Sequence, residues 1–508
     1  MEGREAGAAG NVKATDYIAA ELRRLGVEPA GDSGTYFQQV PLVRRVLFPG
    51  SLLQAEGGAR LGADQIVGLR PLGGNPFGGS WVGRNIPLVF GGRIGTPDMI
   101  SPDSARGAIL VFLPALAASG QIAGNLTGGG GALARYRMAA GVLIAGLEGA
   151  SAPAMAFLRQ TRTILVDPAV PEQPALAAAA LSTASMEALL GRPLAGLRAG
   201  QSLGRLTGRF GFLDTPVPHA ARNVVGIVRG RDPALNQTYI AIGAHTDHDG
   251  VGPVLEHDSV RAFNTVMRPL GANDPVRAPD GAQAARIQTL RDSLRALRPP
   301  RPDSIFNGAD DDASGTAVVL ELAEYFQANR PARSLLLVFH TAEEKGLFGA
   351  SYYTEHPTVP RDSIISMVNL DQVSRGGPED VPGSRANSIY LLGTRRLSSS
   401  LGDLVEAVNS RGHNFLLDYS YDADGHPANG YCRSDHYMYA RFGIPVVFLS
   451  AGWHRDYHMV TDEAQYSNTA TMHRVAMFVR DIVSDVAALP QRPLVDRPRP
   501  DPRAPCRQ

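Results

Sequence analysis

Cysteine is almost absent from this chain of 508 residues. The two cysteines, Cys432 and Cys506, allow at most one disulfide bridge, which excludes a small scaffold held by several bridges. Metal sites built from thiolates need several cysteines, so any metal here must be bound by histidine and carboxylate side chains. Cys506 lies in a Pro/Arg-rich tail at residues 491–508, whose composition predicts disorder.

Neither sign of charge is in excess, because Lys and Arg together number 49 and Asp and Glu also number 49. This balance does not indicate binding to nucleic acid or to an anionic membrane. Long apolar runs are missing, since a stretch such as residues 109–116 is far shorter than the roughly 20 residues that span a bilayer. The opening MEGREAGAAG lacks the apolar core of a signal peptide. We therefore expect a cytoplasmic protein, or one whose targeting segment is absent from this chain.

The hydrophobic content of 44% is enough for globular cores, and the length predicts at least two domains. Residues 76–206 are rich in Gly and Ala, with short β-like runs and few carboxylates or histidines. This texture predicts a separate small domain without chemistry of its own. We therefore expect the chain to divide into residues 1–75, 76–206, 207–490 and the tail at 491–508.

Apolar strands alternate with amphipathic helices after about residue 207. TYIAIGAH, SLLLVFH and residues 364–370 have the composition of buried strands, whereas residues 313–328 and 468–488 have helical periodicity. The pattern predicts an α/β sandwich with a largely buried mixed sheet. Residues 250–306 interrupt it with many Arg, Pro and Asp residues and one expected helix at 283–297. A loop of this length is usually functional or disordered, and we interpret it as an excursion near the active site that serves as a lid.

Five short polar segments carry the residues that could bind a metal. Each follows an expected strand or precedes an expected helix, and in open α/β sheets ligands gather at the carboxyl ends of the strands. Any one of them has a simpler explanation, such as helix capping by an aspartate or a charged turn at the surface. The segments are GAHTDHDG with His245, NGADDDASG with Asp311, HTAEEKGLFG with Glu343 and Glu344, MVNLDQV with Asp371, and GWHRDYHMVTD with His454 and His458.

Taken together, these imidazoles and carboxylates predict a pair of metal ions about 3.5–4 Å apart. Oxygen and nitrogen ligands without thiolate favour Zn²⁺, with Mn²⁺ or Co²⁺ as substitutes. The adjacent Glu343 and Glu344 repel each other unless a cation lies between them, which lets one bind metal while the other moves a proton. Asp247 is placed to accept a hydrogen bond from His245, and His248 is a nearby alternative ligand.

The segments GAHTDHDG, NGADDDASG, AEEKGLFGASYY, VNLDQV, SDHYMYARFGIPVVF and DYHMVTD occur in the order of the M28 family of metallopeptidases, the aminopeptidase Y and bacterial leucyl aminopeptidase group, which this chain resembles. The resemblance covers most of residues 207–488. It implies a mixed-sheet α/β/α fold of the zinc-exopeptidase, phosphorylase/hydrolase-like type. Residues 76–206 are similar in texture and position to an inserted, mainly-β protease-associated (PA) domain.

The resemblance also implies a role for each matching residue. Two Zn²⁺ ions would be bound by five side chains. Asp311 would bridge the two ions, and a cis peptide bond would join it to Asp312. Glu343 would be the general base, and Tyr431 would stabilise the developing oxyanion. Asp247 would orient His245, while Asp435 and His436 would give structural support. The implied ligands are His245 and Asp371 for one zinc and Glu344 and His458 for the other.

Three departures from the family pattern are visible: the long excursion after Gly250, the sequence VTDE at residues 460–463, and the positive charge of Lys345 beside the paired glutamates. The excursion puts the shape of the pocket in question.

The expected activity is hydrolysis of peptide bonds, as an aminopeptidase that removes N-terminal residues. A carboxypeptidase or dipeptidase on the same scaffold is the alternative, because arginine, which recognises carboxylates, is abundant in the excursion. A single-zinc glutaminyl cyclase of related fold is disfavoured by the filled ligand positions. A receptor-like binding protein with a PA domain is a non-catalytic alternative. By resemblance alone, the protein is expected to be secreted or periplasmic, with peptides as partners.

Overall fold

The computed structural model describes residues 1–70, 77–115, 131–150, 152–169, 175–274, 277–381, 384–385 and 387–508. The chain forms two compact units, one made of Met1–Leu42 with Val217–Gln508 and the other of Val43–Pro216. The second unit thus begins before residue 76, where the insert was expected to start. Residue 76 itself lies outside the described residues. The second unit begins earlier because β3 (Leu42–Leu47) and β4 (Leu52–Ala55) pair with β13 (Phe212–Pro216) and β12 (Ser202–Phe210).

A nine-stranded mixed sheet forms the centre of the first unit. Its order is β1-β14-β18-β15-β19-β22-β20-β21, with β2 also paired to β14. The four central strands, β18, β15, β19 and β22, run parallel, whereas β14 is antiparallel to β18 and β20 is antiparallel to β22. The edge strand β21 pairs with β20 in parallel. The bounds are β1 Glu28–Pro29, β2 Phe37–Gln39, β14 Arg222–Val228, β15 Tyr239–His245, β18 Ser334–His340, β19 Ile364–Leu370, β20 Ser388–Leu392, β21 Leu416–Asp418 and β22 Val446–Ser450.

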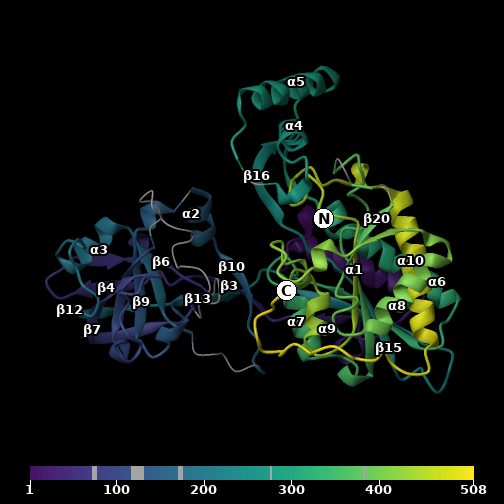
Figure 1. Cartoon of the computed structure of the whole chain (residues 1–508), viewed down its shortest axis with the longest axis horizontal. Coiled ribbons are helices and arrows are strands. Elements are labelled where there is room, and N and C mark those ends of the chain that lie inside the picture. The colour runs from purple at the N-terminus through teal and green to yellow at the C-terminus, as the bar shows by residue number, and fades with distance from the viewer. Residues whose placement is uncertain are drawn as a thin grey trace. The chain divides into compact units, whose positions relative to one another are not determined.

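Helices cover both faces of this sheet (Figure 1). Neighbouring strand residues such as Val224 and Val225 point to opposite faces and enter different apolar clusters. One cluster joins the sheet to α1 (Ala9–Arg24), α6 (Gly315–Ala328), α8 (Ser399–Val408) and α10 (Thr469–Ala488). The other joins it to α7 (Phe348–Glu355) and α9 (His436–Ala440). The predicted α/β/α fold with a mixed sheet is confirmed.

The sequence located most of these elements, because strands buried on both faces are continuously apolar. Residues expected as strands at SLLLVFH and 364–370 coincide with β18 and β19. Among the helices that the sequence did not predict are α8 and α4 (His257–Met267). The buried positions of α4 include His257, Asp258 and Asn264, so its buried face lacks the apolar periodicity by which a helix is recognised.

The excursion is a two-stranded antiparallel ribbon, β16 (Gly250–Glu256) and β17 (Pro302–Phe306), that carries α4 and α5 (Gly281–Leu297). No residue of α5 is buried. The end of the ribbon that carries the helices is held to the rest of the first unit, because Glu463 contacts both His257 Nε2 at 2.9 Å and Arg301 Nη2 at 2.7 Å. Its function as a lid stays a prediction.

The second unit is mainly β, as expected. Its eight-stranded sheet has the order β5-β4-β12-β7-β8-β9-β11-β6, and a three-stranded sheet has the order β10-β3-β13. Apolar clusters pack on the larger sheet, and no metal-binding group of the kind described below was found among the described residues of this unit. The further bounds are β5 Arg60–Gly62, β6 Val67–Gly68, β7 Trp81–Arg93, β8 Ile109–Leu113, β9 Gly141–Ala145, β10 Arg162–Leu165, β11 Ala178–Leu181, α2 Ala152–Arg159 and α3 Thr183–Leu190.

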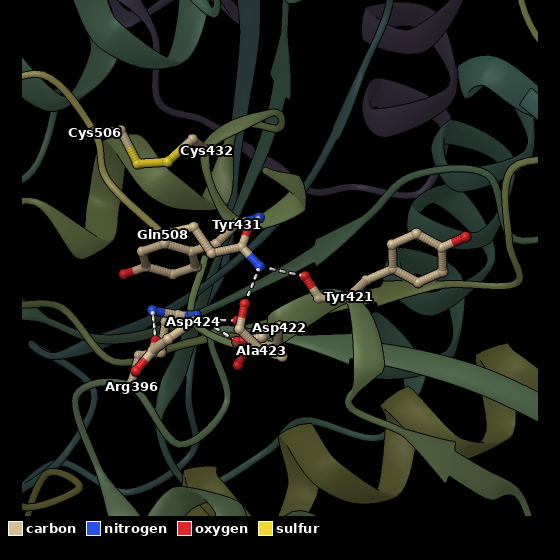
Figure 2. The surroundings of a disulfide bond; sticks show 9 residues. All are labelled: Arg396, Tyr421, Asp422, Ala423, Asp424, Tyr431, Cys432, Cys506 and Gln508. Atoms are coloured by element: carbon tan, nitrogen blue, oxygen red, sulfur yellow. Dashed lines mark hydrogen bonds and ion pairs between the residues drawn. A yellow bond between two sulfur atoms is a disulfide. The ribbon is translucent and has the colours of Figure 1, made fainter. Parts of the chain in front are cut away.

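The expectation that the C-terminal tail is disordered was wrong. Cys506 forms a disulfide with Cys432 of the first unit, and Val495 and Cys506 pack against its apolar cluster. The Gln508 side chain donates to the carbonyl oxygens of Tyr421 and Ala423, as Figure 2 shows. Composition predicted disorder because the tail has few apolar residues; a covalent bond and polar contacts hold it instead. No helix in the described part of the chain is long and apolar enough to cross a membrane.

The disulfide closes a loop across a sequence separation of 74 residues, which restricts the unfolded chain. We expect Cys506→Ser to lower the free energy of unfolding of the first unit by about 2–4 kcal/mol. Denaturant titration with and without reductant measures this. Reduced wild-type protein should match the variant, and the variant should not respond to reductant. A wild-type midpoint that reductant leaves unchanged would contradict the prediction.

Candidate metal centre

The carboxyl ends of four neighbouring parallel strands bring the polar segments together. His245 is the last residue of β15, Glu343 and Glu344 follow β18, and Asp371 follows β19. His458 lies in the loop after β22. Since these strands are adjacent and parallel, their carboxyl ends lie along one edge of the sheet. Asp311 arrives differently, from the segment between β17 and α6.

The first cluster consists of His245, Asp311 and Asp371, all buried. His245 Nε2 lies 3.0 Å from Asp311 Oδ1 and 3.6 Å from Asp371 Oδ1. Ser434 Oγ donates to the other oxygen of Asp371 at 2.8 Å, which fixes the orientation of that carboxylate. One imidazole nitrogen and two carboxylate oxygens therefore converge on a single point.

The second cluster uses the other oxygen of the same aspartate. His458 Nε2 lies 3.1 Å from Asp311 Oδ2 and 3.2 Å from Glu344 Oε2. His248 belongs to this group as well, with Nδ1 2.6 Å from Glu344 Oε1. Asp249 Oδ2 lies 3.1 Å from His458 Nδ1 and orients that ring. The Asp311 carboxylate thus stands between the two clusters.

The run Asp310–Asp312 divides its carboxylates between two tasks. Asp312 accepts from the backbone N–H groups of His245 at 3.0 Å, Gly315 at 2.9 Å and Gln372 at 3.3 Å. Asp310 accepts from the Ser374 N–H and hydroxyl, both at 2.7 Å. Only Asp311 points into the centre, and the expected cis peptide bond to Asp312 is present. Three carboxylates in a row are therefore needed because two hold the backbone that presents the third.

Asp247 holds the turn that carries the paired glutamates. Its carboxylate accepts from the Glu343 N–H at 3.0 Å and the Glu344 N–H at 3.4 Å. The nearest Asp247 carboxylate oxygen is 3.9 Å from His245 Nδ1, while the Asp247 carbonyl oxygen lies 3.1 Å from it. Asp247 therefore orients His245 through its backbone and places Glu343 through its side chain.

Burial and neighbouring charges set the protonation of the centre. Burial raises the pKa of the Glu343 carboxyl well above its usual value, and the Glu344 and Asp371 carboxylates add to the rise against the opposing effect of His245. Burial also favours the neutral form of Asp311, but the adjoining imidazoles of His245 and His458 hold the pKa of this carboxyl well below its usual value. The Glu343 carboxyl therefore binds a proton more readily than the Asp311 carboxyl does.

The donor atoms fit a pair of metal ions. Four buried atoms of the centre have no hydrogen-bond partner among the described residues, which is costly for polar atoms unless a cation binds them. These atoms are His245 Nε2, Asp371 Oδ1, His458 Nε2 and Asp311 Oδ2. Two tetrahedral ligands about 2.0 Å from a zinc ion lie about 3.3 Å apart. The separations of 3.0–3.6 Å within the two clusters agree with that value.

Other residues singled out in the sequence lie around this centre. Asp435 Oδ2 is 3.2 Å from His340 Nδ1, and the His436 ring stacks on Phe448 of β22, so both are built into the buried surroundings. His454 lies with its Nε2 3.4 Å from Asp310 Oδ2, away from the two ligand groups.

Tyr431 has neighbours outside the ligand set. Its ring lies against the ring of Tyr437. The guanidinium of Arg396 faces the Tyr431 ring, with its Cζ 4.5 Å from the ring centroid (Figure 2). The tyrosine that does lie beside a ligand is Tyr457, with its ring centroid 4.0 Å from that of His458. Sequence reasoning missed Tyr457 and Asp249, although each directly adjoins a histidine of the motifs.

Residues 290–483 match the model of peptidase family M28. The matched stretch contains Asp311, Glu343, Glu344, Asp371 and His458, whereas His245 precedes it. The predicted resemblance to this family is therefore confirmed over the matched residues. The resemblance of residues 76–206 to a PA domain stays a prediction.

Two curated relatives match short stretches. A vacuolar membrane protease of Schizosaccharomyces japonicus is 39% identical over 70 residues, which are 14% of this chain and 8% of that protein. A probable zinc metalloprotease of Leptosphaeria maculans is 32% identical over 116 residues, 22% of this chain and 25% of that protein. The chain thus covers at most 25% of the length of these two relatives.

Solved structures resemble the whole chain more loosely. An aminopeptidase from Aneurinibacillus sp. strain AM-1 has a TM-score of 0.48 and 18% identity, over 97% of this chain and 93% of that chain. BSAP, a zinc aminopeptidase from Bacillus subtilis, has a TM-score of 0.45 and 16% identity, over 95% of this chain and 90% of that chain.

The Asp312 carboxylate satisfies three buried N–H groups, so its removal should destabilise the first unit even without metal. We expect Asp312→Ala to lower the free energy of unfolding by about 3 kcal/mol, since each orphaned buried donor costs about 1–3 kcal/mol. Denaturant titration of metal-free protein measures this. Asp424→Ala, a change at a side chain 93% exposed, is the control and should stay within about 0.5 kcal/mol. Equal stability of the two variants would show that Asp312 does not hold the ligand loops.

Proposed function

We propose that this protein is a zinc metallopeptidase that binds two Zn²⁺ ions and removes N-terminal residues from peptides. The observation that carries the proposal is the position of Asp311, whose two carboxylate oxygens face His245 on one side and His458 on the other. A single buried carboxylate between two imidazole-containing clusters is what a two-metal site requires. The names of the curated relatives, which include a probable zinc metalloprotease, support zinc as the metal.

Bound there, the zinc pair would supply a water activated at neutral pH and an electrophile for the peptide carbonyl. Glu343 is the group of this chain that moves the proton. It is buried and adjoins the ligand Glu344, and its raised pKa suits a base that accepts a proton and then delivers it to the leaving amine. Asp247 keeps Glu343 in place through the backbone of the turn.

The arginines of the excursion were the reason to consider a carboxypeptidase. In the structure three of these arginines are bound by the protein itself: Arg298 contacts Asp258, Arg301 contacts Glu463, and Arg268 donates to the carbonyl oxygens of Arg455 and Tyr457. Arginines engaged in this way are not available to a substrate carboxylate.

One observation favours the second candidate, a peptidase that recognises a substrate carboxylate. Arg433 is exposed, and its Nη2 donates to the hydroxyl of Tyr457 at 3.0 Å, next to the ligand His458. This guanidinium is the feature of the described surface near His458 that would suit a carboxypeptidase or dipeptidase.

We further propose that the protein works outside the cytosol. The Cys432–Cys506 disulfide supports this, because disulfides persist in oxidising compartments. The second unit, mainly β and without a metal-binding group among its described residues, fits a PA-like accessory domain rather than a second catalytic one.

The general base is tested by Glu343→Gln, which keeps the shape of the side chain and removes its ability to accept a proton. We expect kcat to fall by about three orders of magnitude or more while zinc content stays the same. Elemental analysis and steady-state kinetics measure the two quantities. His245→Ala is the contrast variant and should lose both zinc and activity. Turnover near the wild-type rate in Glu343→Gln would exclude this role.

The reaction class is tested with aminoacyl p-nitroanilides and N-blocked dipeptides, each with and without a chelator. We expect two zinc ions per chain and release of nitroaniline that the chelator abolishes. Two zinc ions with cleavage of only the blocked dipeptides would favour the carboxylate-recognising alternative. A protein that retains no zinc after dialysis would favour a non-catalytic binding function.

A further inference from the structure

Arg4 is a buried arginine close to the candidate metal centre, yet it belongs to none of the segments that carry ligands. It ends the short turn Glu2–Arg4 that precedes α1, and the whole residue is 9% exposed. Its guanidinium donates to four carbonyl oxygens: Thr246 at 2.9 Å, Asn307 at 2.5 Å, Gly308 at 2.9 Å and Asp311 at 3.5 Å. A buried arginine that bonds mainly to backbone carbonyls fixes the position of loops.

The four carbonyl groups belong to two ligand segments. Thr246 directly follows His245, and residues 307–311 form the segment that ends in Asp311. These segments are far apart in the sequence and reach the centre from different elements, β15 and the loop after β17. Arg4 is therefore a direct bridge between the backbone that presents His245 and the backbone that presents Asp311.

The residues next to Arg4 also contact the segments that carry the ligands. The His248 N–H donates to the Arg4 carbonyl oxygen at 3.4 Å. A Cβ added at Gly3, whose φ is +68°, would lie 2.2 Å from the Gly250 carbonyl oxygen, so the two backbones are in close contact. Glu5 Oε1 lies 3.3 Å from Lys345 Nζ, beside the paired glutamates. The segment thus contacts three of the five ligand segments.

The charge of Arg4 also suits its surroundings. Burial lowers the pKa of Arg4, but the carboxylates of Asp247, Asp311, Asp312 and Asp462 oppose this effect. The guanidinium offers donors in a planar fork, which a lysine ammonium cannot reproduce at several carbonyls at once. The site therefore needs an arginine and not merely a positive charge.

We propose that Arg4 is a positioning residue that holds the His245 and Asp311 loops at metal-binding separation, so that zinc affinity depends on it. This inference rests on the proposed zinc site. Arg4 touches neither ligand side chain, and it acts through the backbone that carries them. Residues that orient metal ligands typically change metal affinity by about 10–100-fold when they are replaced.

The test replaces Arg4 with Lys and with Ala in the full chain. Zinc affinity is measured by competition with a chromophoric chelator, and circular dichroism checks that each variant is folded. We expect both variants to bind zinc about 10–100-fold more weakly than wild type. At saturating zinc, kcat should recover in large part and KM should change little, because Arg4 is expected to position ligands and not substrate.

Arg222→Ala is the matched control. Arg222 binds the same N-terminal part of the chain, through the carbonyl oxygen of Val12, the hydroxyl of Thr15 and the carboxylate of Asp16, but contacts no ligand segment. It should lower the unfolding temperature and leave zinc affinity within about twofold of wild type. If Arg4→Ala does not fold, Arg4→Lys carries the test.

Two results would overturn the inference while leaving the proposed function intact. One is wild-type zinc affinity in Arg4→Lys and Arg4→Ala, and the other is an equal loss of zinc affinity in Arg222→Ala, which would reflect general destabilisation. A wild-type protein that binds no zinc would overturn both the inference and the proposed function.

Discussion

Mutual repulsion among buried carboxylates is the constraint on which the rest of the first unit depends. Asp311, Glu343, Glu344 and Asp371 meet at the carboxyl ends of β18, β15 and β19, where burial makes each negative charge costly. The imidazoles of His245 and His458 relieve part of this cost by contacting Asp311. Four ligand atoms of the centre still have no hydrogen-bond partner among the described residues, and cations bound between them would offset the remaining negative charge. The same constraint explains why so much polar structure is buried beneath the ligands.

The buried polar side chains beneath the ligands bind backbone N–H groups of the ligand segments. Asp312 ties the N–H groups of three segments together, Asp462 accepts from the N–H groups of Asp310 and Asp311, and Asp247 fixes the glutamate turn. Several residues beside the ligands have positive φ, among them Ala342, Gln372 and His458 itself. Such conformations persist only where the surrounding structure determines them. The many hydrogen bonds to the backbone of the ligand segments, including those from Arg4, hold these residues in their conformations.

The two insertions are attached to the first unit in different ways. The chain passes into the second unit after Leu42 and returns to the first unit at Val217. The second unit has its own sheets and apolar clusters. The excursion instead begins directly after Asp249, which contacts His458, and ends just before Asn307, whose carbonyl oxygen accepts from Arg4. Both ends of the excursion therefore adjoin segments that carry the ligands. This placement is consistent with an effect on the centre, whereas the second unit is a body of its own.

The sequence by itself determined the central strands, the fold class and the residues that converge, because continuous apolar runs followed by polar residues at their ends have few structural explanations. It could not place the boundary of the second unit, since strand pairing between β3 and β13 depends on residues far apart in the chain. Composition also misjudged the C-terminal tail, which a disulfide and the contacts of Gln508 hold in place. Only the tertiary structure decided what the side chains of Asp310 and Asp312 contact, that Tyr457 rather than Tyr431 lies beside His458, and that Arg4 joins two ligand loops. The physical reason is that these choices depend on the direction of a side chain after long-range packing, and local sequence pattern carries no information about that direction.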